Sequence, residues 1–528
     1  MQTAELARAP GRPASTVCPF CGSGCSMFLS GTASYPRRHH PVSEGALCLR
    51  GWSAGELLRS PARVVTAYRR SPGEPLQPTP VERAFDEAAT CLADIRRRHG
   101  GASIGILGSA RITVEEAQAL RRLAAALGTP HLDTLQRAGY VPFPPLSLRD
   151  IEEARRITVL GANLTVRQPQ VARRLVRAAD RGARVRFVHS RRVQLYSLAA
   201  EHVVTQPGHE LDALGELDPD ELVLLSSEIT LSGQGSEAVA RLAGRRAMFL
   251  TDYANQRGVI EAGLHPTGEG LSAWEMLNAA AEGRLKALLI FADDPFEFFP
   301  TLSARAFAGV ELSVVVDAVK TRSAGRADIV LPGALLAEKR GTVVNTEGRV
   351  QEIAPAAAAL AAWNEGDIAA ELARRVGDGT EPGPVPVYEP QPGGRGGELP
   401  GEEYPFLAAL DTTLFWNSHA LIAATATAWR EARSLFADFP PGCVTLNPDD
   451  ARALKLQYAG SVTVTSPSGS ITLPARLHAR MLPGTVWIAM PCWERCGVKL
   501  GALDYDTGLR VPIFRPRAVR VSRPQARA

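Results

Sequence analysis

Four cysteines close to the N-terminus constrain this chain more than any other feature of its sequence. They follow the spacing C-x2-C-x3-C-x22-C and stand at Cys18, Cys21, Cys25 and Cys48. One tight loop can present the first three thiolates, and the fourth closes the site from a distant segment, which is typical of a [4Fe–4S] cluster. Gly22 and Gly24 let the backbone bend around such a cluster and direct N–H groups at its sulfurs. The sequence therefore predicts one cluster held by four thiolates.

A structural zinc site is the alternative, because zinc is also bound by four thiolates. Such sites usually consist of two separated C-x2-C pairs, whereas this chain has one. His39 and His40 could replace one ligand, but histidines in polar loops are more often solvated. From the residues alone, the zinc alternative stays open beside the cluster.

The bulk composition is that of an ordinary globular protein with several domains. The chain has 528 residues, 45% hydrophobic and 22% charged, with a formal net charge of +4. So small a charge gives no sign of binding to nucleic acid or to a membrane surface. We find no apolar leader and no run of eighteen apolar residues, and therefore expect a cytoplasmic protein without a membrane span. In that compartment the eight cysteines are not expected to form a disulfide framework.

Short apolar runs alternate with amphipathic stretches between residues 61 and 375, as they do in βαβ units. In the clearest case a strand at 103–107 precedes a helix that begins at a capping box of Thr113 and Glu116 and ends at Gly128. Further strands are predicted at 157–160, 184–188, 222–225, 247–250, 287–291 and 312–316, with helices at 170–181 and 235–243. Parallel sheets covered by helices are the economical interpretation.

The predicted fold class is α/β, with an N-terminal [4Fe–4S] domain, two doubly wound α/β domains and a C-terminal β-barrel. A stretch rich in Pro and Gly cannot pack a core, and short alternating strands follow it between residues 443 and 520. The expected division is a cluster domain at 1–60, a dinucleotide-binding-like α/β domain at 61–230, a second α/β domain at 231–375, a linker at 376–404 and a barrel at 405–528.

The sequence segments around the cysteines, VCPFCGSGC and HPVSEGALCLRGW, resemble the N-terminal module of the molybdopterin oxidoreductases. That family includes formate dehydrogenases, periplasmic-type nitrate reductases and the large iron–sulfur subunit of complex I. Later segments resemble it in the same order. They are a strand–turn–helix at 108–129, a dinucleotide-binding half at 157–188, the central signature RADIVLPGALLAEKRGTVVNTEGRVQ at 326–351 and a pterin-dinucleotide-binding barrel from residue 443.

In this family the cluster relays electrons between a pterin cofactor and partner subunits. The resemblance therefore implies the same role here, with other iron–sulfur or flavin redox subunits as partners. Shortly after the last cysteine in sequence, the family usually has a Lys whose side chain lies between cluster and pterin. At this place the chain has Arg50. Arg remains charged and offers a rigid fork of donors, so Arg50 is a candidate electron-transfer residue. The complex I subunits tolerate Arg at this position; the plain alternative is a surface Arg at a turn.

Catalytic members of the family hold molybdenum or tungsten through a Cys or selenocysteine, in some cases Ser or Asp. In formate dehydrogenases that ligand lies between the first helix and the next strand, and here residues 129–154 contain no cysteine. Asp133 or Ser147 could in principle serve instead. The other cysteines are unsuited by position: Cys91, Cys443, Cys492 and Cys496. We assign no catalytic residue, and whether this chain converts a substrate by itself stays open.

Binding of molybdopterin guanine dinucleotide is a separate question. Gly161 and Asn163 follow a strand and precede a helix, where a pyrophosphate can meet helix N–H groups. The family usually has Pro where this chain has Leu164, Asp-Pro-Arg where it has residues 189–191, and Asp where it has Glu210. These exchanges weaken guanine recognition, because carboxylate–base hydrogen bonds are sensitive to length. The complete barrel argues for the cofactor, so its binding stays open, with Gly161, Asn163 and Glu210 as candidate contacts.

Two smaller features have plainer explanations beside the functional ones. Cys492 and Cys496 offer only two ligands for a second metal and are better explained as buried barrel thiols. Trp416 and His419 fall where the family's barrel touches the pterin, or pack between linker and barrel.

The chain is therefore predicted to be an iron–sulfur electron-transfer subunit of a multi-subunit oxidoreductase, similar to the complex I large subunit. One alternative is a formate-dehydrogenase-type molybdenum or tungsten enzyme with an atypical metal ligand. The other is a redox-inactive scaffold with a structural metal site.

Overall fold

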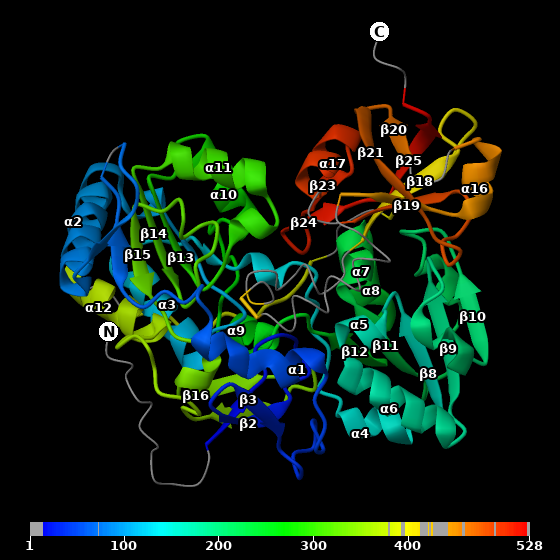
Figure 1. Ribbon diagram of the computed structural model, residues 1–528, viewed down its shortest axis with the longest axis horizontal. Coiled ribbons are helices and arrows are strands. Elements are labelled where there is room, and N and C mark those ends of the chain that lie inside the picture. The colour runs from blue at the N-terminus through cyan, green and yellow to red at the C-terminus, as the bar shows by residue number, and fades with distance from the viewer. Residues whose placement is uncertain are drawn as a thin grey trace.

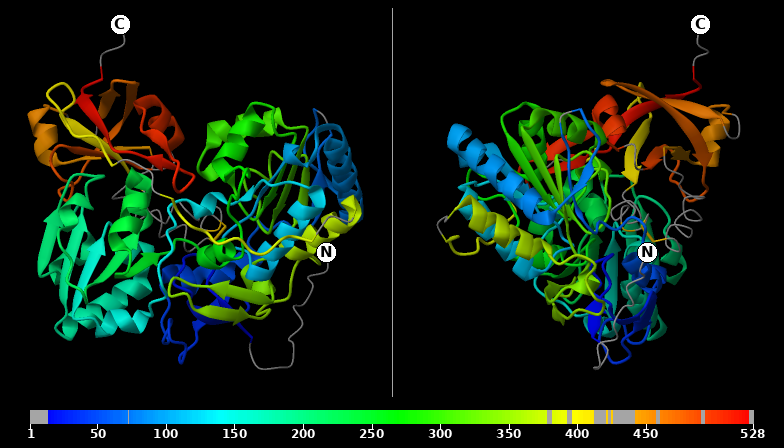
Figure 2. Two further views of the ribbon diagram at one scale, coloured as in Figure 1. Left: turned by 180° about the vertical axis from the view of Figure 1, so that it is seen from behind. Right: turned by 60° about the vertical axis from the view of Figure 1, so that its left-hand side comes forward.

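The computed structural model describes residues 14–71, 73–377, 381–391, 396–411, 421, 424–425, 442–456, 460–489 and 493–524. A small N-terminal unit, residues 14–60 and here called the cluster unit, lies below and between two α/β units (Figures 1 and 2). The C-terminal barrel lies over the α/β unit that contains β8 (Arg156–Leu160) to β12 (Arg246–Leu250). Among the described residues, none of the helices combines the length and apolarity needed to cross a membrane.

The cluster unit is a three-stranded antiparallel sheet with two short helical turns against it. The strands are β1 (Ser15–Val17), β2 (Ser26–Ser30) and β3 (Ala33–Pro36). Helix α1 (Leu49–Ser53) and the 3-10 turn Ala54–Arg59 pack against β3, where the Gly55 N–H donates to Ser34 Oγ at 3.1 Å. The unit has little core of its own, so its fold depends on contacts with the rest of the chain.

The first α/β unit is built on a five-stranded parallel sheet in the order β10-β9-β8-β11-β12. Its strands are β8 (Arg156–Leu160), β9 (Arg184–His189), β10 (Glu201–Val204), β11 (Leu222–Ser226) and β12 (Arg246–Leu250). Strand β11 is buried along its whole length, because α4 (Leu148–Glu153) and α6 (Pro169–Asp180) cover one face of the sheet and α8 (Gly235–Leu242) the other. Such burial explains its continuous apolar run.

The second α/β unit contains a seven-stranded sheet in the order β5-β4-β15-β14-β13-β6-β7. Its strands are β4 (Ala67–Arg69), β5 (Gln77–Thr79), β6 (Ile104–Leu107), β7 (Leu132–Asp133), β13 (Ala287–Phe291), β14 (Leu312–Asp317) and β15 (Ile329–Pro332). Only β4 and β5 run antiparallel to their neighbours. In Figure 1 the sheet lies between two groups of helices: α2 (Val81–His99), α3 (Val114–Leu127) and α12 (Glu365–Val376) on one face, and α10 (Ala273–Ala281) and α11 (Pro300–Gly309) on the other.

The strands and helices predicted between residues 103 and 316 are present, but the boundary expected at residue 230 does not match the sheets. Strand β6 pairs with β13, so residues 67–133 share a sheet with residues 287–332, and β12 joins β8–β11. The five-stranded unit is thus inserted into the sequence of the seven-stranded one. Strand partners so far apart in the chain are chosen by tertiary packing, which local patterns do not report. The outer boundaries and the linker remain predictions.

The C-terminal unit is a closed barrel in the order β18-β22-β19-β21-β20-β25, as the sequence predicted. Its strands are β18 (Phe406–Asp411), β19 (Val444–Leu446), β20 (Ser461–Ser466), β21 (Gly469–Leu477), β22 (Thr485–Ala489) and β25 (Arg517–Ser522). Among the described residues of this unit, the helices are α16 (Pro448–Ala453) and α17 (Trp493–Leu500). A two-stranded arm of β23 (Leu503–Asp506) and β24 (Val511–Phe514) reaches the seven-stranded unit, where Tyr505 stacks on Trp274 at 5.2 Å between ring centroids.

Candidate functional site

The four cysteines of the predicted cluster site come from the loops of the N-terminal unit. Cys18 follows β1, Cys25 precedes β2, and Cys48 is the residue before α1. The Cys18 N–H donates to the Cys25 carbonyl at 2.9 Å, which closes the loop that carries the first three thiols. Cys18, Cys21 and Cys25 are only 4–5% exposed, whereas Cys48 is partly exposed.

Electrostatics indicate that these thiols lie near one another. Burial raises the pKa of Cys25 well above its ordinary value, and the charges of Cys18, Cys21 and Cys48 raise it further. Burial and the neighbouring thiolates also raise the pKa of Cys18. Four thiolates this close to each other need a compensating positive group, which bound iron supplies.

The thiols are not packed as the ligands of one ion. No group of three or more His, Cys, Asp or Glu side chains within the described ranges is placed to hold a single metal ion. In a cubane each thiolate binds its own iron, so a cluster does not require four sulfurs to meet around one ion. His40, considered as a substitute ligand, accepts a hydrogen bond from the Val42 N–H at 3.4 Å and lies 3.1 Å from Gln351 Nε2. His39 is exposed.

The cluster loop is clamped by the turn after β16 (Gly341–Val344) and by β17 (Val350–Ile353). Asn345 Nδ2 donates to the Ser23 carbonyl at 3.0 Å, and Gln351 Nε2 donates to the Gly24 carbonyl at 2.9 Å. The Gly22 N–H, expected to face the cluster, instead donates to the Thr251 carbonyl at 3.1 Å. A Cβ at Gly22 would lie 1.7 Å from Thr251 Oγ1, so this glycine is required for close packing.

Arg50 joins the cluster unit to the five-stranded unit. Its Nη2 donates to the carbonyl oxygens of Val166 at 3.1 Å and Arg167 at 2.8 Å, in the short helix α5 (Leu164–Arg167), and its guanidinium also donates to Cys48. Burial alone would lower the pKa of Arg50, but the thiolates, first of all that of Cys21, raise it above its ordinary value. Arg50 is therefore a buried, permanently charged bridge and not a surface Arg at a turn.

The five-stranded sheet has a switch point at its carboxyl edge between β8 and β11, where the connections leave in opposite directions. Ligands of open α/β sheets bind at such switch points. Gly161 lies there with φ of 57°; its N–H donates to the Val188 carbonyl at 2.9 Å and its own carbonyl accepts from Ser226 Oγ. Asn163 precedes α5, which has only four residues, and its Oδ1 accepts from Thr165 Oγ1 at 3.0 Å.

Glu210 lines a cavity between this sheet edge and the barrel. The cavity holds about 370 Å³ of space, partly open to solvent, and its other walls include Ser190, Glu228, Trp487 and Phe514. Glu210 Oε2 accepts from the Gly208 N–H at 2.9 Å and from Gln234 Nε2 at 2.8 Å. Gly161 and Asn163 lie at the same sheet edge without lining this cavity.

Two aromatic groups on the barrel side of this cavity support a planar or charged ligand there. The Trp487 ring lies 4.6 Å from the Arg191 guanidinium carbon. Trp487 Nε1 is buried and has no hydrogen-bond partner among the described residues. Phe514 lines the same cavity from β24. An orphaned donor in a cavity of this kind fits a polar ligand that supplies the missing acceptor.

A buried arginine that the sequence analysis missed lies under the cavity. Arg167 Nη1 donates to Ser227 Oγ at 2.8 Å and to Asp252 Oδ1 at 2.5 Å, and its Nε donates to Glu228 Oε1 at 3.3 Å. Burial would lower the pKa of Arg167, but Asp252 and Glu228 raise it above its ordinary value. Because the Arg167 carbonyl also accepts from Arg50, this residue connects the cluster unit to the cavity wall.

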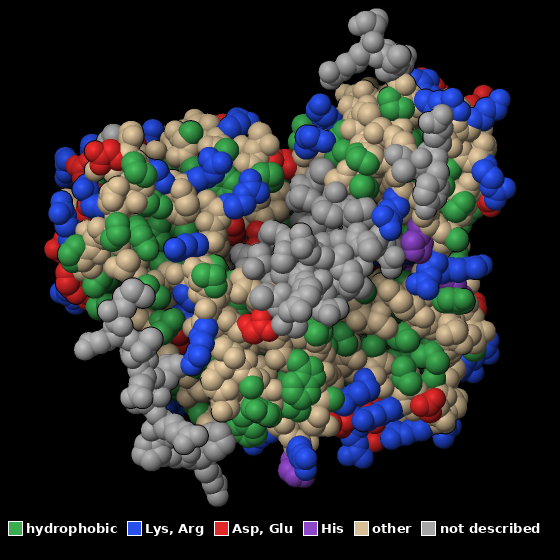
Figure 3. All heavy atoms as spheres, viewed as in Figure 1, with side chains coloured by type: hydrophobic (Ala, Val, Ile, Leu, Met, Phe, Trp, Pro, Cys, Tyr) green, Lys and Arg blue, Asp and Glu red, His purple; other side chains and the backbone are tan. Residues whose placement is uncertain are grey.

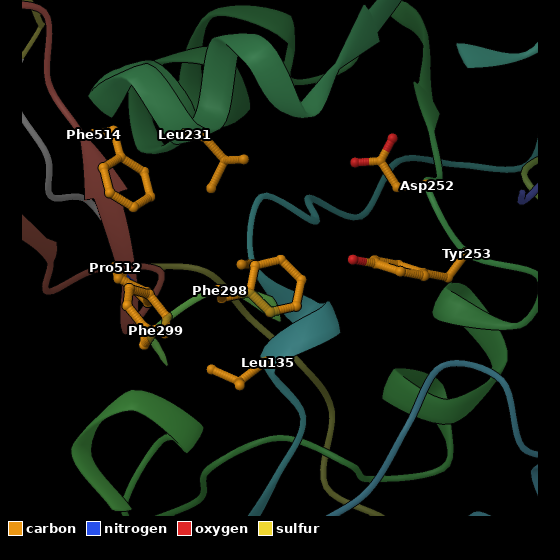
Figure 4. A pocket seen from close by; sticks show the side chains of 9 residues that line it. Leu135, Leu231, Asp252, Tyr253, Phe298, Phe299, Pro512 and Phe514 are labelled. Carbon is orange, nitrogen blue, oxygen red and sulfur yellow. The ribbon is translucent and has the colours of Figure 1, made fainter. Parts of the chain in front are cut away.

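A second cavity adjoins the first, since Leu231 and Phe514 line both. It holds about 410 Å³ of space, and its remaining walls are Leu135, Ala138, Asp252, Tyr253, Phe298, Phe299 and Pro512. Figure 4 shows Asp252 and Tyr253 on one side of the cavity and the apolar side chains opposite them. The walls come from both α/β units and from the arm of the barrel, so this cavity lies where the three meet.

The seven-stranded sheet has a matching switch point between β6 and β13, which the sequence analysis also missed. Asp293, 1% exposed, lies there; its Oδ1 accepts from Gln136 Nε2 at 3.1 Å, and its Oδ2 has no hydrogen-bond partner among the described residues. Burial raises the pKa of Asp293 to about 7, an effect that Arg111 opposes. The preceding residue, Ala292, has φ of 52°, a strained value of the kind found at binding sites.

The side chains considered as substitute metal ligands are engaged elsewhere. Asp133 accepts hydrogen bonds from Arg137 Nε at 2.8 Å and from Arg137 Nη2 at 2.9 Å. Ser147 is the N-cap of α4, where its side chain accepts a hydrogen bond from the Asp150 N–H. Cys496 is buried in the barrel core, as expected. Trp416, His419 and Cys492 lie outside the described residues.

Three family models match the chain. Residues 14–60 match the molybdopterin oxidoreductase Fe4S4 domain, residues 220–375 match molybdopterin oxidoreductase, and residues 422–509 match the molydopterin dinucleotide binding domain. The first match contains all four candidate cysteines and Arg50.

Curated relatives match most of the chain at low identity. The F420-dependent formate dehydrogenase 2 subunit alpha of Methanococcus maripaludis is 23% identical over 96% of this chain and 99% of that protein. The NADPH-Fe(3+) oxidoreductase subunit alpha of Geobacter sulfurreducens is 23% identical over 94% and 74%. One subunit of the NADH-quinone oxidoreductase of Mycobacterium tuberculosis is 26% identical over 65% and 50%.

Among solved structures, acetylene hydratase from Pelobacter acetylenicus superposes with a TM-score of 0.66 over 97% of this chain and 100% of that one. At 14% identity this likeness establishes a common fold and nothing about the reaction.

Proposed function

Because the chain belongs to the molybdopterin oxidoreductase family, we propose that it is an electron-transfer subunit of a multi-subunit oxidoreductase. It carries an Fe4S4 domain and a dinucleotide-binding domain, and the cofactors are therefore a [4Fe–4S] cluster and molybdopterin guanine dinucleotide. The observation that carries the proposal is the buried bridge from Cys48 through Arg50 and Arg167 to Glu228, which lines the same cavity as Glu210 and Trp487.

The proposed cluster ligands are Cys18, Cys21, Cys25 and Cys48. The cluster supplies one-electron storage, while the chain holds the thiolates in place and excludes water from three of them. The clamps from Asn345 and Gln351 fix the loop that bears these cysteines. Arg50 adds a positive charge that stabilises the reduced, more negative state of the cluster.

The proposed contacts of the dinucleotide lie in the cavity beside the barrel and at the switch points of the two sheets. The pterin group supplies a second redox-active centre when bound. In the cavity between the five-stranded sheet and the barrel, Glu210 can accept hydrogen bonds and Trp487 Nε1 can donate one. At the switch point of the seven-stranded sheet, Asp293 offers an oxygen without a partner among the described residues. Gly161 gives the backbone the left-handed turn that follows β8 at the switch point. Asn163 precedes α5, the helix whose carbonyl oxygens accept hydrogen bonds from Arg50.

A second candidate is a formate-dehydrogenase-type molybdenum or tungsten enzyme with an atypical metal ligand. The observation that favours it is the match over nearly the whole length of a formate dehydrogenase alpha subunit. Against it stand the lack of cysteine in residues 129–154 and the ion pair that occupies Asp133. Other iron–sulfur or flavin subunits are the proposed partners, and a cytoplasmic location remains a prediction.

Anaerobic purification with its native partners, followed by metal analysis and dye reduction, separates these candidates. The electron-transfer proposal expects iron near four atoms per chain and a cluster that is reduced and reoxidised, with no dye reduction driven by formate. Formate-dependent dye reduction with molybdenum or tungsten bound would favour the second candidate. Zinc in place of iron would favour the redox-inactive scaffold.

A further inference from the structure

We propose that the surface formed by Leu49 and Trp52 of α1 docks an acidic electron-carrier protein. This inference rests on the proposed function, because it requires a redox-active cluster beneath this surface. One electron passes between the carrier's own redox centre and the cluster, and no bond or atom is exchanged. The carrier is thus oxidised as the cluster is reduced, or the reverse.

The first observation is that the cluster site comes nearest to solvent at Cys48. The other three cysteines are 4–5% exposed, and only Cys48 of the four is partly exposed. Electron transfer between proteins slows steeply with the distance between their centres. A partner therefore gains most by docking over the corner of the cluster held by Cys48.

The second observation is the pair of apolar side chains that cover this corner. Helix α1 turns Arg50, Gly51 and Ser53 inward, whereas Leu49 is 38% exposed and Trp52 is 48% exposed. The Trp52 N–H donates to the Cys48 carbonyl at 3.0 Å, so Trp52 stands one helical turn after Cys48. Helical side chains lean toward the N-terminus of their helix, which brings the indole over the turn that begins at Cys48.

Exposed aromatic side chains of this kind are typical of interface centres. Trp contributes a large contact area and is enriched among the residues that carry most binding energy. Figure 3 shows hydrophobic side chains gathered over α1 on a face that is open to solvent. The inward face of the same helix is fully used by the protein itself, so Leu49 and Trp52 are left for a partner.

The third observation is the charge around this surface. Residues 14–60 contain four arginines against two glutamates and neither Lys nor Asp. The exposed arginines are Arg37, Arg38 and Arg59. One of the glutamates, Glu44, is paired with Arg173 and Arg177 of α6. In Figure 3, Lys and Arg side chains with a few Asp and Glu gather over α4 and α6 beside the hydrophobic group. The net positive charge of the domain that carries this surface favours an acidic partner.

The test measures reduction of the cluster by stopped-flow absorption, using an acidic bacterial ferredoxin as one reductant and the methyl viologen radical as the other. The variants are Trp52→Asp and Leu49→Asp; the matched control is Val498→Asp, which places the same charge at a helical Val that is 62% exposed on α17. We expect the rate constant with ferredoxin to fall at least tenfold in the α1 variants and to stay unchanged in the control. With wild-type protein it should also fall as salt is added.

The viologen arm separates failure of this inference from failure of the proposed function. Viologen needs no docking surface, so it should reduce the cluster equally in all three variants and in wild type. The docking proposal would be overturned if the α1 variants were reduced by ferredoxin as fast as wild type. It would also be overturned if ferredoxin did not reduce the wild-type cluster at all. Neither result would contradict the presence of the cluster. Lack of reduction by viologen in wild type would instead overturn the electron-transfer function.

Discussion

Arg50 Nη2 donates a hydrogen bond to the carbonyl oxygen of Arg167 at 2.8 Å, and the Arg167 side chain in turn holds Asp252. Two buried arginines therefore connect the cysteine unit to the wall of the cavity in Figure 4. Neither contact is local in sequence, because 117 positions separate the first pair and 85 the second. The connection holds the cluster unit, which has little core of its own, in a fixed position beside the cavity that Asp252 lines.

Replacing Arg50 should change the reduction potential of the cluster. Arg50→Met removes a positive charge beside Cys48, which destabilises the reduced state and lowers the potential by about 60 mV, equivalent to about 1.4 kcal/mol for a one-electron couple. Arg50→Lys retains the charge and should shift the potential less. A redox titration followed by electron paramagnetic resonance measures both; equal potentials in wild type and Arg50→Met would contradict the bridge.

Replacing Glu210 should lower the amount of bound dinucleotide. Glu210→Gln keeps the size of the side chain but removes the carboxylate that lines the cavity, so pterin extracted per chain should fall several-fold. Glu216→Gln is the matched control, because Glu216 is exposed nearby in the sequence. Fluorescence of the oxidised pterin quantifies the result. Full pterin content in Glu210→Gln would exclude this residue as a contact.

Breaking the ion pair at Arg167 should be strongly destabilising. Arg167→Met removes the buried guanidinium that pairs with Asp252 and Glu228, and breaking a buried ion pair typically costs about 3–5 kcal/mol. The control is Arg149→Met, whose pair with Glu153 is exposed and should be worth about 1 kcal/mol or less. Urea unfolding compares the variants. Similar midpoints for both would mean that the buried pair adds little.

Asp293 should make the folded state less stable as the pH rises toward neutrality. Its pKa is raised from 3.8 to about 7, so the folded state binds a proton that the unfolded state has released. This contribution to stability is fully present below about pH 4 and is lost as the pH rises to about 7, at up to about 1.4 kcal/mol per pH unit. Asp293→Asn should flatten the dependence across this window. Urea midpoints between pH 4 and 7 provide the measurement, and parallel profiles would refute the assignment.

The parts of the fold that were predictable from the sequence depend on short-range patterns. The capping box of Thr113 and Glu116 marks the start of α3, and Gly128, with φ of 67°, ends it as expected. The cysteine spacing likewise identified its loop, because three of the thiols lie within eight residues. Such signals need no knowledge of which segments meet in space.

What the sequence did not reveal depends on contacts between distant segments. The pairing of β6 with β13, and with it the placement of residues 67–133, follows from packing that no local pattern encodes. In the sequence nothing distinguishes Arg167 from the other arginines; its role follows from the ion pair with Asp252, which only the structure shows. The sequence did contain a sign of Asp293, because two acidic residues follow the buried run of β13. That β13 lies beside β6 at a switch point of the sheet is visible only in the structure.

The central claim is that Cys18, Cys21, Cys25 and Cys48 hold one [4Fe–4S] cluster. The most direct measurement is electron paramagnetic resonance of the anaerobically reduced protein with iron analysis of the same sample, in wild type, Cys25→Ser and the control Cys91→Ser. The account predicts about four irons and one reducible cluster signal per chain in wild type and in Cys91→Ser, with loss of both in Cys25→Ser. Bound zinc without a cluster signal in wild type, or an unchanged signal in Cys25→Ser, would contradict it.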